Sequence, residues 1–211
     1  MGSCYCSLQG CSSMGGYLMT VEDKATAILQ ATLELVAEHG FHGTAMSKIA
    51  QRSCVSAGII YHYFENKDDL MQALYVNIKQ RFAEAMITEE VLHLPYPDYL
   101  LKAWQNAYQF YIEHPLVTRY IEQFENSPYY ATIDLSAIEQ NFNPLMTRIY
   151  ADMQNGLIKN MPHWVIYDLT LGVALNVAKH VLVGLLQPND KLLLEIAQSC
   201  HAAIAKGTLL G

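Results

Sequence analysis

The sequence lacks the short motifs that identify the common enzyme families. Its 211 residues contain no GxSxG, no HExxH, no phosphate-binding glycine loop and no dinucleotide-binding fingerprint. The eight histidines are not accompanied by cysteines or carboxylates at the spacing of metal ligands. We therefore expect no enzyme activity, no catalytic residue, no metal and no cofactor.

Strand-like alternation, internal repeats and low-complexity segments are also missing. Apolar residues recur instead three and four positions apart, which is the period of an amphipathic helix. The length fits a protein of two helical domains with a sizeable core. The predicted fold class is all-α.

Positive charge is scarce, since 13 Lys and Arg stand against 20 Asp and Glu, for a net charge of −7. Residues 20–86 hold six basic and eight acidic residues, and residues 87–211 hold seven and twelve. No basic segment precedes an apolar one, so a secretory signal is not indicated. Five cysteines, an uneven number, without a signal favour a reducing cytoplasm.

Residues 1–19 carry neither charge nor a helical period, yet they hold three of the five cysteines. This Cys-x-Cys-x₄-Cys cluster could bind a metal or sense oxidants. We favour a disordered leader, either engineered or read from an upstream start codon. The other two cysteines, Cys54 and Cys200, are expected to be small buried apolar residues.

Residues 44–70, TAMSKIAQRSCVSAGIIYHYFENKDDL, hold the densest run of helix signals in the chain. Thr44 is expected to cap one helix, Ser56 a second and Asn66 a third. Val55, in the turn between the first two, should pack inward. A support helix, a short turn and a presented helix make a helix-turn-helix.

A long amphipathic helix is predicted before this motif. Gly40 fits a left-handed position at its end, and Phe41 packs back on it. The apolar stripe comprises Val21, Ala25, Ile28, Leu29, Thr32, Leu35 and Val36.

Residues 21–86 resemble the DNA-binding domain of TetR-family transcriptional regulators. The matching segments are EHGFHGTA, MSKIA, VSAGIIYHYF and NKDDL, which occur in the family's order and spacing. The resemblance implies a cytoplasmic homodimer that binds a palindromic operator in double-stranded DNA. It further implies a repressor that a small molecule releases. Cys54 stands where the family usually has glycine, so a left-handed non-glycine residue is expected there.

The aperiodic leader and the resemblance together imply a domain plan. Residues 1–19 form the leader, residues 20–66 the helix-turn-helix domain, and residues 67–211 a helical ligand-binding and dimerisation domain. The fourth helix, over residues 67–86, would connect the two domains. Two alternatives stay open: a TetR-like coregulator that binds protein or ligand without an operator, and a ligand-binding helical enzyme.

DNA contacts are expected around the support and presented helices. Ala57, Gly58, Ile59 and His62 would face the bases, and the apolar members could touch thymine methyl groups. Phosphates would be held by side chains and helix N-termini at matching family positions. The full predicted set is Thr44, Lys48, Ser56, Ala57, Gly58, Ile59, Tyr61, His62, Tyr63 and Lys67.

Residues 164–186 are apolar enough to suggest a membrane span. Asp168, Lys179 and other polar residues interrupt them, however, and each is costly near a bilayer centre. We favour one long helix, running from Pro162 to Leu186 and buried at a dimer interface, with no membrane involved. Its interface stripe is Leu171, Leu175, Ala178, Leu182 and Leu185.

The distal region is rich in aromatic residues, which either fill a core or line an apolar pocket. We expect a pocket for a small hydrophobic or aromatic effector. Few Lys and Arg are present there to meet a strongly anionic ligand. The predicted lining is Trp104, Tyr108, Tyr111, Phe124, Tyr130, Phe142, Asn176 and His180.

Overall fold

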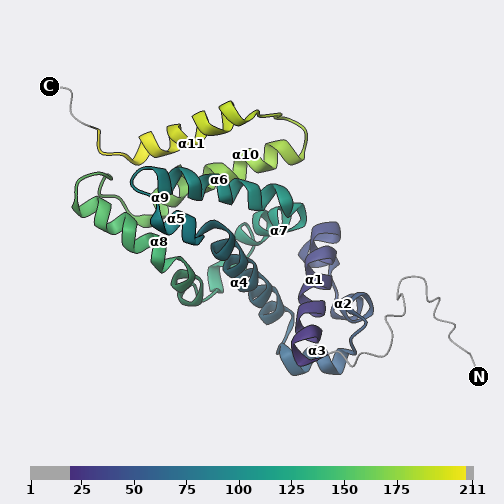
Figure 1. The fold of residues 1–211 in the computed structure, drawn as a ribbon. Helices are drawn as coiled ribbons and strands as arrows, with labels where there is room; N and C mark the ends of the chain where they lie inside the picture. The colour runs from purple at the N-terminus through teal and green to yellow at the C-terminus, as the bar shows by residue number, and fades with distance from the viewer. Residues whose placement is uncertain (1–19, 208–211) are drawn as a thin grey trace, which may run out of the picture. The chain divides into compact units, whose positions relative to one another are not determined.

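The computed structural model describes residues 20–207, and the regular elements in this range are helices (Figure 1). One isolated antiparallel bridge pairs Ile158 with Ala205. The predicted all-α class is therefore confirmed. The chain forms two compact units that divide between Met71 and Gln72, within helix α4 (Lys67–Met86). The boundary expected between residues 66 and 67 lies at the start of this helix and stays a prediction.

Unit 1 contains α1 (Val21–Gly43), α2 (Met46–Ser53), α3 (Ala57–Tyr63) and the start of α4. Thr20 and Asp23 form a capping box at the start of α1. The Asp23 amide donates to the Thr20 hydroxyl at 3.2 Å, and the Thr20 amide donates to the Asp23 carboxylate at 2.8 Å. The unit buries apolar side chains from all three helices and their turns: Ile28, Leu35, Val36, Ile49, Val55 and Ile60.

The predicted stripe of α1 holds in its central part. Ile28, Thr32, Leu35 and Val36 are buried, whereas Val21 at the helix start is exposed. The stripe therefore begins later than the sequence pattern suggests.

Gly40 interrupts α1 with φ 69° and ψ 177°, a conformation that side chains disfavour. One more turn follows to Gly43, so the predicted helix end is a kink. Thr44 then closes α1, fully buried, and its hydroxyl donates to the Gly40 carbonyl at 2.8 Å. The prediction that Thr44 caps the next helix is wrong, because Ala45 holds that position without a side-chain hydrogen bond.

The turn between α2 and α3 has the predicted backbone conformation. Cys54 adopts the left-handed conformation at φ 55°, and Val55 is buried. The Ser56 hydroxyl accepts a hydrogen bond from the Ile59 amide at 3.4 Å, as an N-cap does. Cys54 itself is exposed, which contradicts the expectation of a buried residue, while Cys200 is buried as expected.

The start of α4 is held by reciprocal hydrogen bonds. The Asn66 side-chain oxygen accepts from the Asp69 amide at 2.9 Å, as predicted. The Asp69 carboxylate in turn accepts from the Glu65 amide at 2.9 Å.

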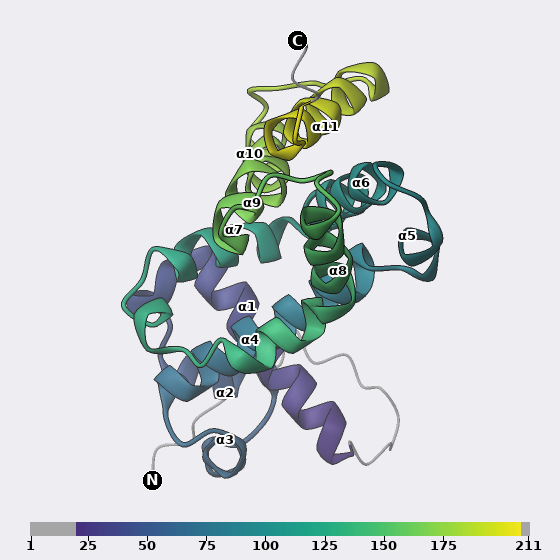
Figure 2. The same ribbon diagram turned by 90° about the vertical axis from the view of Figure 1, so that its left-hand side faces the viewer.

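Unit 2 continues α4 and adds the remaining helices of the described chain (Figure 2). Helix α6 is central to it and packs against α5, α7, α10 and α11. The elements after α4 are α5 (Glu89–His93), α6 (Asp98–Glu113), α7 (Pro115–Glu125), the 3-10 turn η1 (Tyr130–Thr132), α8 (Ser136–Gln154), α9 (His163–Leu169), α10 (Leu171–Leu182) and α11 (Asp190–Ile204).

Aromatic rings form much of the core of unit 2. The Tyr75 and Phe124 rings stack with centroids 4.2 Å apart, and those of Phe82 and Tyr111 stack at 5.0 Å. These contacts join α4 to α6 and α7, and such pairs add to the free energy of simple apolar burial.

The predicted single helix from Pro162 to Leu186 is wrong. Thr170, at φ −123° and ψ −83°, separates α9 from α10, and its hydroxyl donates to the Ile166 carbonyl at 2.6 Å. By length and composition alone, His163–Leu182 is the one stretch of the described residues that could span a membrane, with mean hydropathy 1.3. Core helices of water-soluble proteins meet the same criterion, so this is weak evidence for a membrane span.

Candidate functional site

The seven-residue helix α3 presents its first half outward from unit 1. Ser56, Ala57 and Gly58 are exposed, as are Tyr61 and His62 further along the helix. Ile60, by contrast, has no exposed surface and anchors α3 to the core. Ile59 is half-buried between these two faces. Of the residues expected to face DNA bases, Ala57, Gly58 and Ile59 therefore lie at the start of one short helix, and His62 lies near its end.

Gly58 leaves an open approach to the backbone of α3. A Cβ atom built at this position would meet nothing within 4 Å. The fold itself therefore does not require glycine here, and the absent side chain leaves room for another molecule.

Several of the expected phosphate-contacting residues make hydrogen bonds within unit 1. The Tyr63 hydroxyl donates to the Val21 carbonyl at 2.9 Å, and the Lys67 ammonium donates to the Phe41 carbonyl. Thr44 is buried and bonded to Gly40. Tyr61, which is 54% exposed, and Lys48 remain at the surface.

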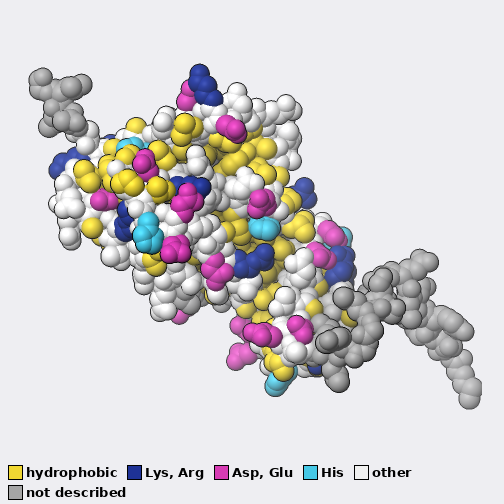
Figure 3. All heavy atoms as spheres, viewed as in Figure 1, with side chains coloured by type: hydrophobic (Ala, Val, Ile, Leu, Met, Phe, Trp, Pro, Cys, Tyr) yellow, Lys and Arg dark blue, Asp and Glu magenta, His cyan; other side chains and the backbone are white. Residues whose placement is uncertain are grey.

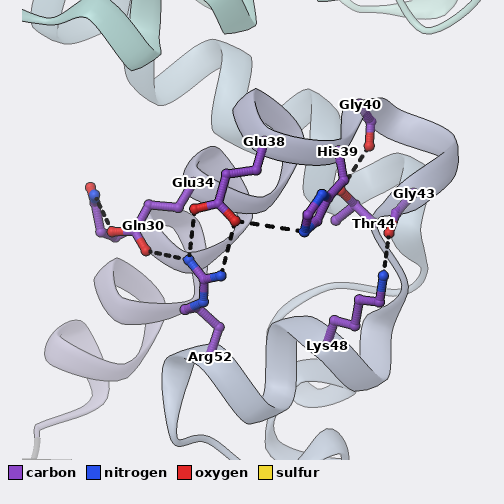
Figure 4. Close-up of polar contacts among 9 residues, drawn as sticks. All are labelled: Gln30, Glu34, Glu38, His39, Gly40, Gly43, Thr44, Lys48 and Arg52. Carbon is purple, nitrogen blue, oxygen red and sulfur yellow. Dashed lines mark hydrogen bonds and ion pairs between the residues drawn. The ribbon is translucent and has the colours of Figure 1, made fainter. Parts of the chain in front are cut away.

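The basic residues of α2 are held by side chains and the last carbonyl of α1 (Figure 4). Arg52 forms ion pairs of 3.1 Å with both Glu34 and Glu38, and Lys48 donates to the Gly43 carbonyl at 3.1 Å. The Arg52 guanidinium lowers the pKa of Glu38, and the two carboxylates raise the pKa of Arg52. Arg52 therefore joins α2 to α1, and its charge is largely neutralised there.

Unit 2 encloses a cavity of about 360 Å³, at the small end of the range for small-molecule sites. Of the residues expected to bind the effector, Trp104, Tyr130 and Phe142 line it. The other five predicted residues lie elsewhere. Tyr108, Tyr111 and Phe124 are buried in the packed core, while Asn176 and His180 are exposed on α10 and supply no polar contact to the cavity.

An ion pair between a buried lysine and a half-buried glutamate at this cavity was not predicted from the sequence. The Lys79 ammonium, on a residue only 6% exposed, lies 3.1 Å from a Glu125 carboxylate oxygen, which also accepts from the Tyr75 hydroxyl at 2.8 Å. Burial acts to lower the pKa of Lys79, but Tyr167, Glu125 and other neighbours outweigh it and raise the pKa. The available signal was a lone lysine within the apolar stripe of α4, four residues after Tyr75 and three before Phe82.

An exposed apolar surface lies over the end of α10 and the start of α11 (Figure 3). Within the predicted interface stripe, Leu182 and Leu185 are exposed and Leu171 is half-buried. Leu175 and Ala178 are buried within the protomer, so they do not belong to that surface. The exposed members of the two helices and their connection are Leu182, Val183, Leu185, Leu192 and Leu194.

The cysteine cluster of residues 1–19 lies outside the described residues. Within residues 20–207, no group of three or more His, Cys, Asp or Glu side chains is placed to hold a metal ion.

Two family models match the chain, one in each part. Residues 28–74 match the model described as bacterial regulatory proteins, tetR family. Residues 95–205 match the model described as Tetracyclin repressor-like, C-terminal domain, which covers more than half of the sequence.

Similar proteins agree with these models. An uncharacterized HTH-type transcriptional regulator from Haemophilus influenzae is 26% identical over 158 residues, covering 74% of this chain and 82% of the relative. The crystal structure of a TetR family transcription regulator from Marinobacter aquaeolei has a TM-score of 0.77 at 23% identity, covering 88% and 97% of the two chains. The transcriptional regulator FadR from Bacillus subtilis, in complex with stearoyl-CoA, has a TM-score of 0.61 at 19% identity, covering 84% and 95%.

The helix-turn-helix of unit 1 and the all-helical unit 2 define a DNA-binding regulator of transcription rather than an enzyme. With a family model matched over half its length, the chain belongs to the TetR family of transcriptional regulators.

Proposed function

We propose that this protein is a cytoplasmic repressor that binds a palindromic operator as a homodimer and releases it when a small apolar effector enters the cavity of unit 2. The observation that carries the proposal is the exposed start of α3. There, Ser56, Ala57 and Gly58 are turned outward on a helix whose inner face is anchored by Ile60.

In the proposed complex, α3 enters the major groove. Ala57 and Ile59 contact thymine methyl groups, and His62 supplies a hydrogen bond to a base edge. The two α3 helices of a dimer read half-sites about 34 Å apart or a multiple of this spacing. The dimer forms through the exposed apolar surface of α10 and α11, whose leucine and valine side chains gain free energy when a partner covers them.

Phosphate contacts come from the exposed side chains of Lys48, Tyr61 and Ser56. Lys67 and Tyr63 also contribute where their internal hydrogen bonds leave a donor or acceptor for a phosphate. An ammonium has three donors, so Lys67 can contact both the Phe41 carbonyl and a phosphate. We leave Thr44 out of the proposed interface, because its side chain is buried and its hydroxyl is used by Gly40.

The effector acts through α4, the helix that the two units share. Its first residue is Lys67, and Tyr75 and Lys79 further along line the cavity. An effector that binds the DNA-free arrangement about 2.7 kcal/mol more tightly than the DNA-binding one shifts the equilibrium between the two arrangements roughly a hundredfold. FadR from Bacillus subtilis, bound to stearoyl-CoA, supports the idea that this fold can take up a ligand with a long apolar chain.

The test is selection of binding sites from random DNA with the full chain, followed by footprinting. We expect one palindromic motif. Gly58→Leu fills open space, so it should leave the melting temperature within a few degrees and reduce operator affinity at least tenfold. Ala85→Leu, at an exposed position of α4 in unit 2, is the control and should bind as the unchanged protein does.

If the protein is a folded dimer and the selection enriches no motif, the proposal of operator binding is overturned. That result would favour the alternative in which the protein acts as a coregulator and contacts another protein.

A further inference from the structure

We propose that the buried end of the cavity selects effectors carrying one uncharged oxygen, a carbonyl or hydroxyl group, which Lys79 and Tyr167 bind. We call the part of the wall formed by Tyr75, Lys79, Glu125 and Tyr167 the polar end. The inference rests on the proposed function, in which this cavity holds the effector.

Lys79 has capacity left for a ligand. Its ammonium has three donors, and the described structure shows one hydrogen bond, to the Glu125 carboxylate. The rings of Tyr75, Phe82 and Tyr167 surround it, with centroids 5.2, 5.9 and 5.5 Å from the nitrogen. Aromatic faces stabilise the charge without occupying a donor as an oxygen would.

Two hydroxyl groups near this lysine have no hydrogen-bond partner beyond each other within the described residues, so at most one of their two protons is used between them. They belong to Tyr167, which lines the cavity, and to Tyr111 in the core beside it. Burial raises the pKa of Tyr111 well above its usual value, so this hydroxyl is neutral. Leaving a buried hydroxyl unsatisfied costs about 1–3 kcal/mol, and a ligand oxygen placed against Tyr167 recovers part of that cost.

The charges around the cavity disfavour a carboxylate or phosphate on the ligand. Lys79 is the one Lys or Arg in the wall, against the carboxylates of Glu125, Glu139 and Asp168. Since Glu125 already neutralises Lys79, a buried anion would lack a counter-charge. A cationic group would meet the Lys79 ammonium and is disfavoured as well.

Most of the remaining wall is apolar, although it also includes polar residues such as Asn143, Thr170 and His201, and it fits a largely apolar body. Ile149, Ile166 and Ile204 are buried there, and both tryptophans of the chain, Trp104 and Trp164, line it. Trp104 is almost fully buried, whereas Trp164 is exposed. Binding should therefore change the intrinsic fluorescence of both indoles.

The experiment compares four ten-carbon probes on the full chain: 2-decanone, 1-decanol, decanoate and decylammonium. Tryptophan fluorescence and titration calorimetry give the dissociation constants. We expect the ketone and the alcohol to bind at least tenfold more tightly than either charged probe. Equal or tighter binding of decanoate overturns the inference, and so does failure of all four probes to bind.

Variants test the residues themselves. Tyr167→Phe keeps the ring and removes the hydroxyl, so calorimetry should show three- to tenfold weaker binding of 2-decanone. Tyr108→Phe removes a hydroxyl from a tyrosine that does not line the cavity, and should leave binding unchanged. Because Lys79→Met alone would leave the Glu125 carboxylate without its counter-charge, we combine Lys79→Met with Glu125→Leu. This double variant should bind 2-decanone more weakly, because the Lys79 donors are gone, and should still disfavour decanoate, because the site offers a buried carboxylate no counter-charge.

The outcome can separate this inference from the proposed function. If the uncharged probes bind as expected but leave the operator bound, effector release fails and the selectivity stands. If decanoate binds best and releases the operator, release stands and the proposed selectivity is overturned.

Discussion

The hydroxyl of Tyr63 donates a hydrogen bond to the carbonyl oxygen of Val21, 2.9 Å away. The bond joins the last residue of α3 to the first residue of α1, 42 positions earlier in the chain. One end of α3 is thus fixed by this bond and the other by the Ser56 cap. Such a short helix owes its stability to contacts of this kind, since isolated helices of this length are marginal.

Tyr61 and Tyr63 should therefore respond differently to loss of the hydroxyl. Tyr63→Phe removes an internal bond and should lower the free energy of unfolding by about 0.5–1.5 kcal/mol. Tyr61→Phe, at an exposed position, should leave stability unchanged and weaken operator binding. Urea unfolding and gel-shift titration of both variants check this, and a stability loss in Tyr61→Phe would contradict it.

Lys48→Ala should weaken binding to specific and random DNA alike. Each phosphate contact by a cation releases about one counterion, so the slope of log K against log salt should fall by about 1. Fluorescence anisotropy at several salt concentrations measures the slope. Lys191→Ala, an exposed lysine in α11, is the control and should leave it unchanged. An unaltered slope in Lys48→Ala would remove this residue from the interface.

Ile59→Asn should change the preferred operator. An amide side chain at this position can hydrogen-bond to adenine, whereas isoleucine can only make apolar contacts. We expect a preference change of about 1–3 kcal/mol at one base pair, read out by repeating the selection with the variant. Recovery of the same site would show that Ile59 does not face the bases.

The helix-turn-helix was predictable because its determinants are local. Ser56 caps its own helix, Cys54 takes the left-handed turn position, and Asn66 bonds to a residue three positions away. Thr44 was assigned wrongly because a hydroxyl can bond forward to an amide or back to a carbonyl. The kink at Gly40 exposes a carbonyl within its reach.

The cavity was less predictable because it depends on packing between distant helices. Trp104 and Tyr111 lie on the same face of α6, yet Trp104 lines the cavity and Tyr111 does not. Periodicity identifies a buried face and cannot tell which buried residue borders empty space. Lys79 was missed for a related reason, since its partner Glu125 lies 46 positions away.

Acid should destabilise the fold partly through His201. Burial lowers the pKa of this imidazole, whose Nε2 lies 2.8 Å from the Tyr96 hydroxyl. Below about pH 6.5 the unfolded chain takes up this proton more readily than the folded one. The free energy of unfolding should therefore fall as the pH drops from about 6.5 through the lower folded pKa.

His201→Gln should remove that part of the pH dependence, as measured by urea unfolding at pH 7.5 and 5.5. His180→Gln, at an exposed position of α10, should keep the full dependence. Identical pH profiles for the two variants would show that His201 is not responsible.

The exposed leucines of α10 and its connection to α11 should hold the dimer, while the buried ones hold the protomer. Leu185 is 77% exposed and Leu175 only 8%. Leu185→Glu places a charge where an apolar partner surface is expected, so sedimentation should show a folded monomer. Leu175→Glu places the charge in the core of unit 2, where an unpaired carboxylate is costly, so the protein should unfold or precipitate. A folded dimer of Leu185→Glu would move the interface away from this surface.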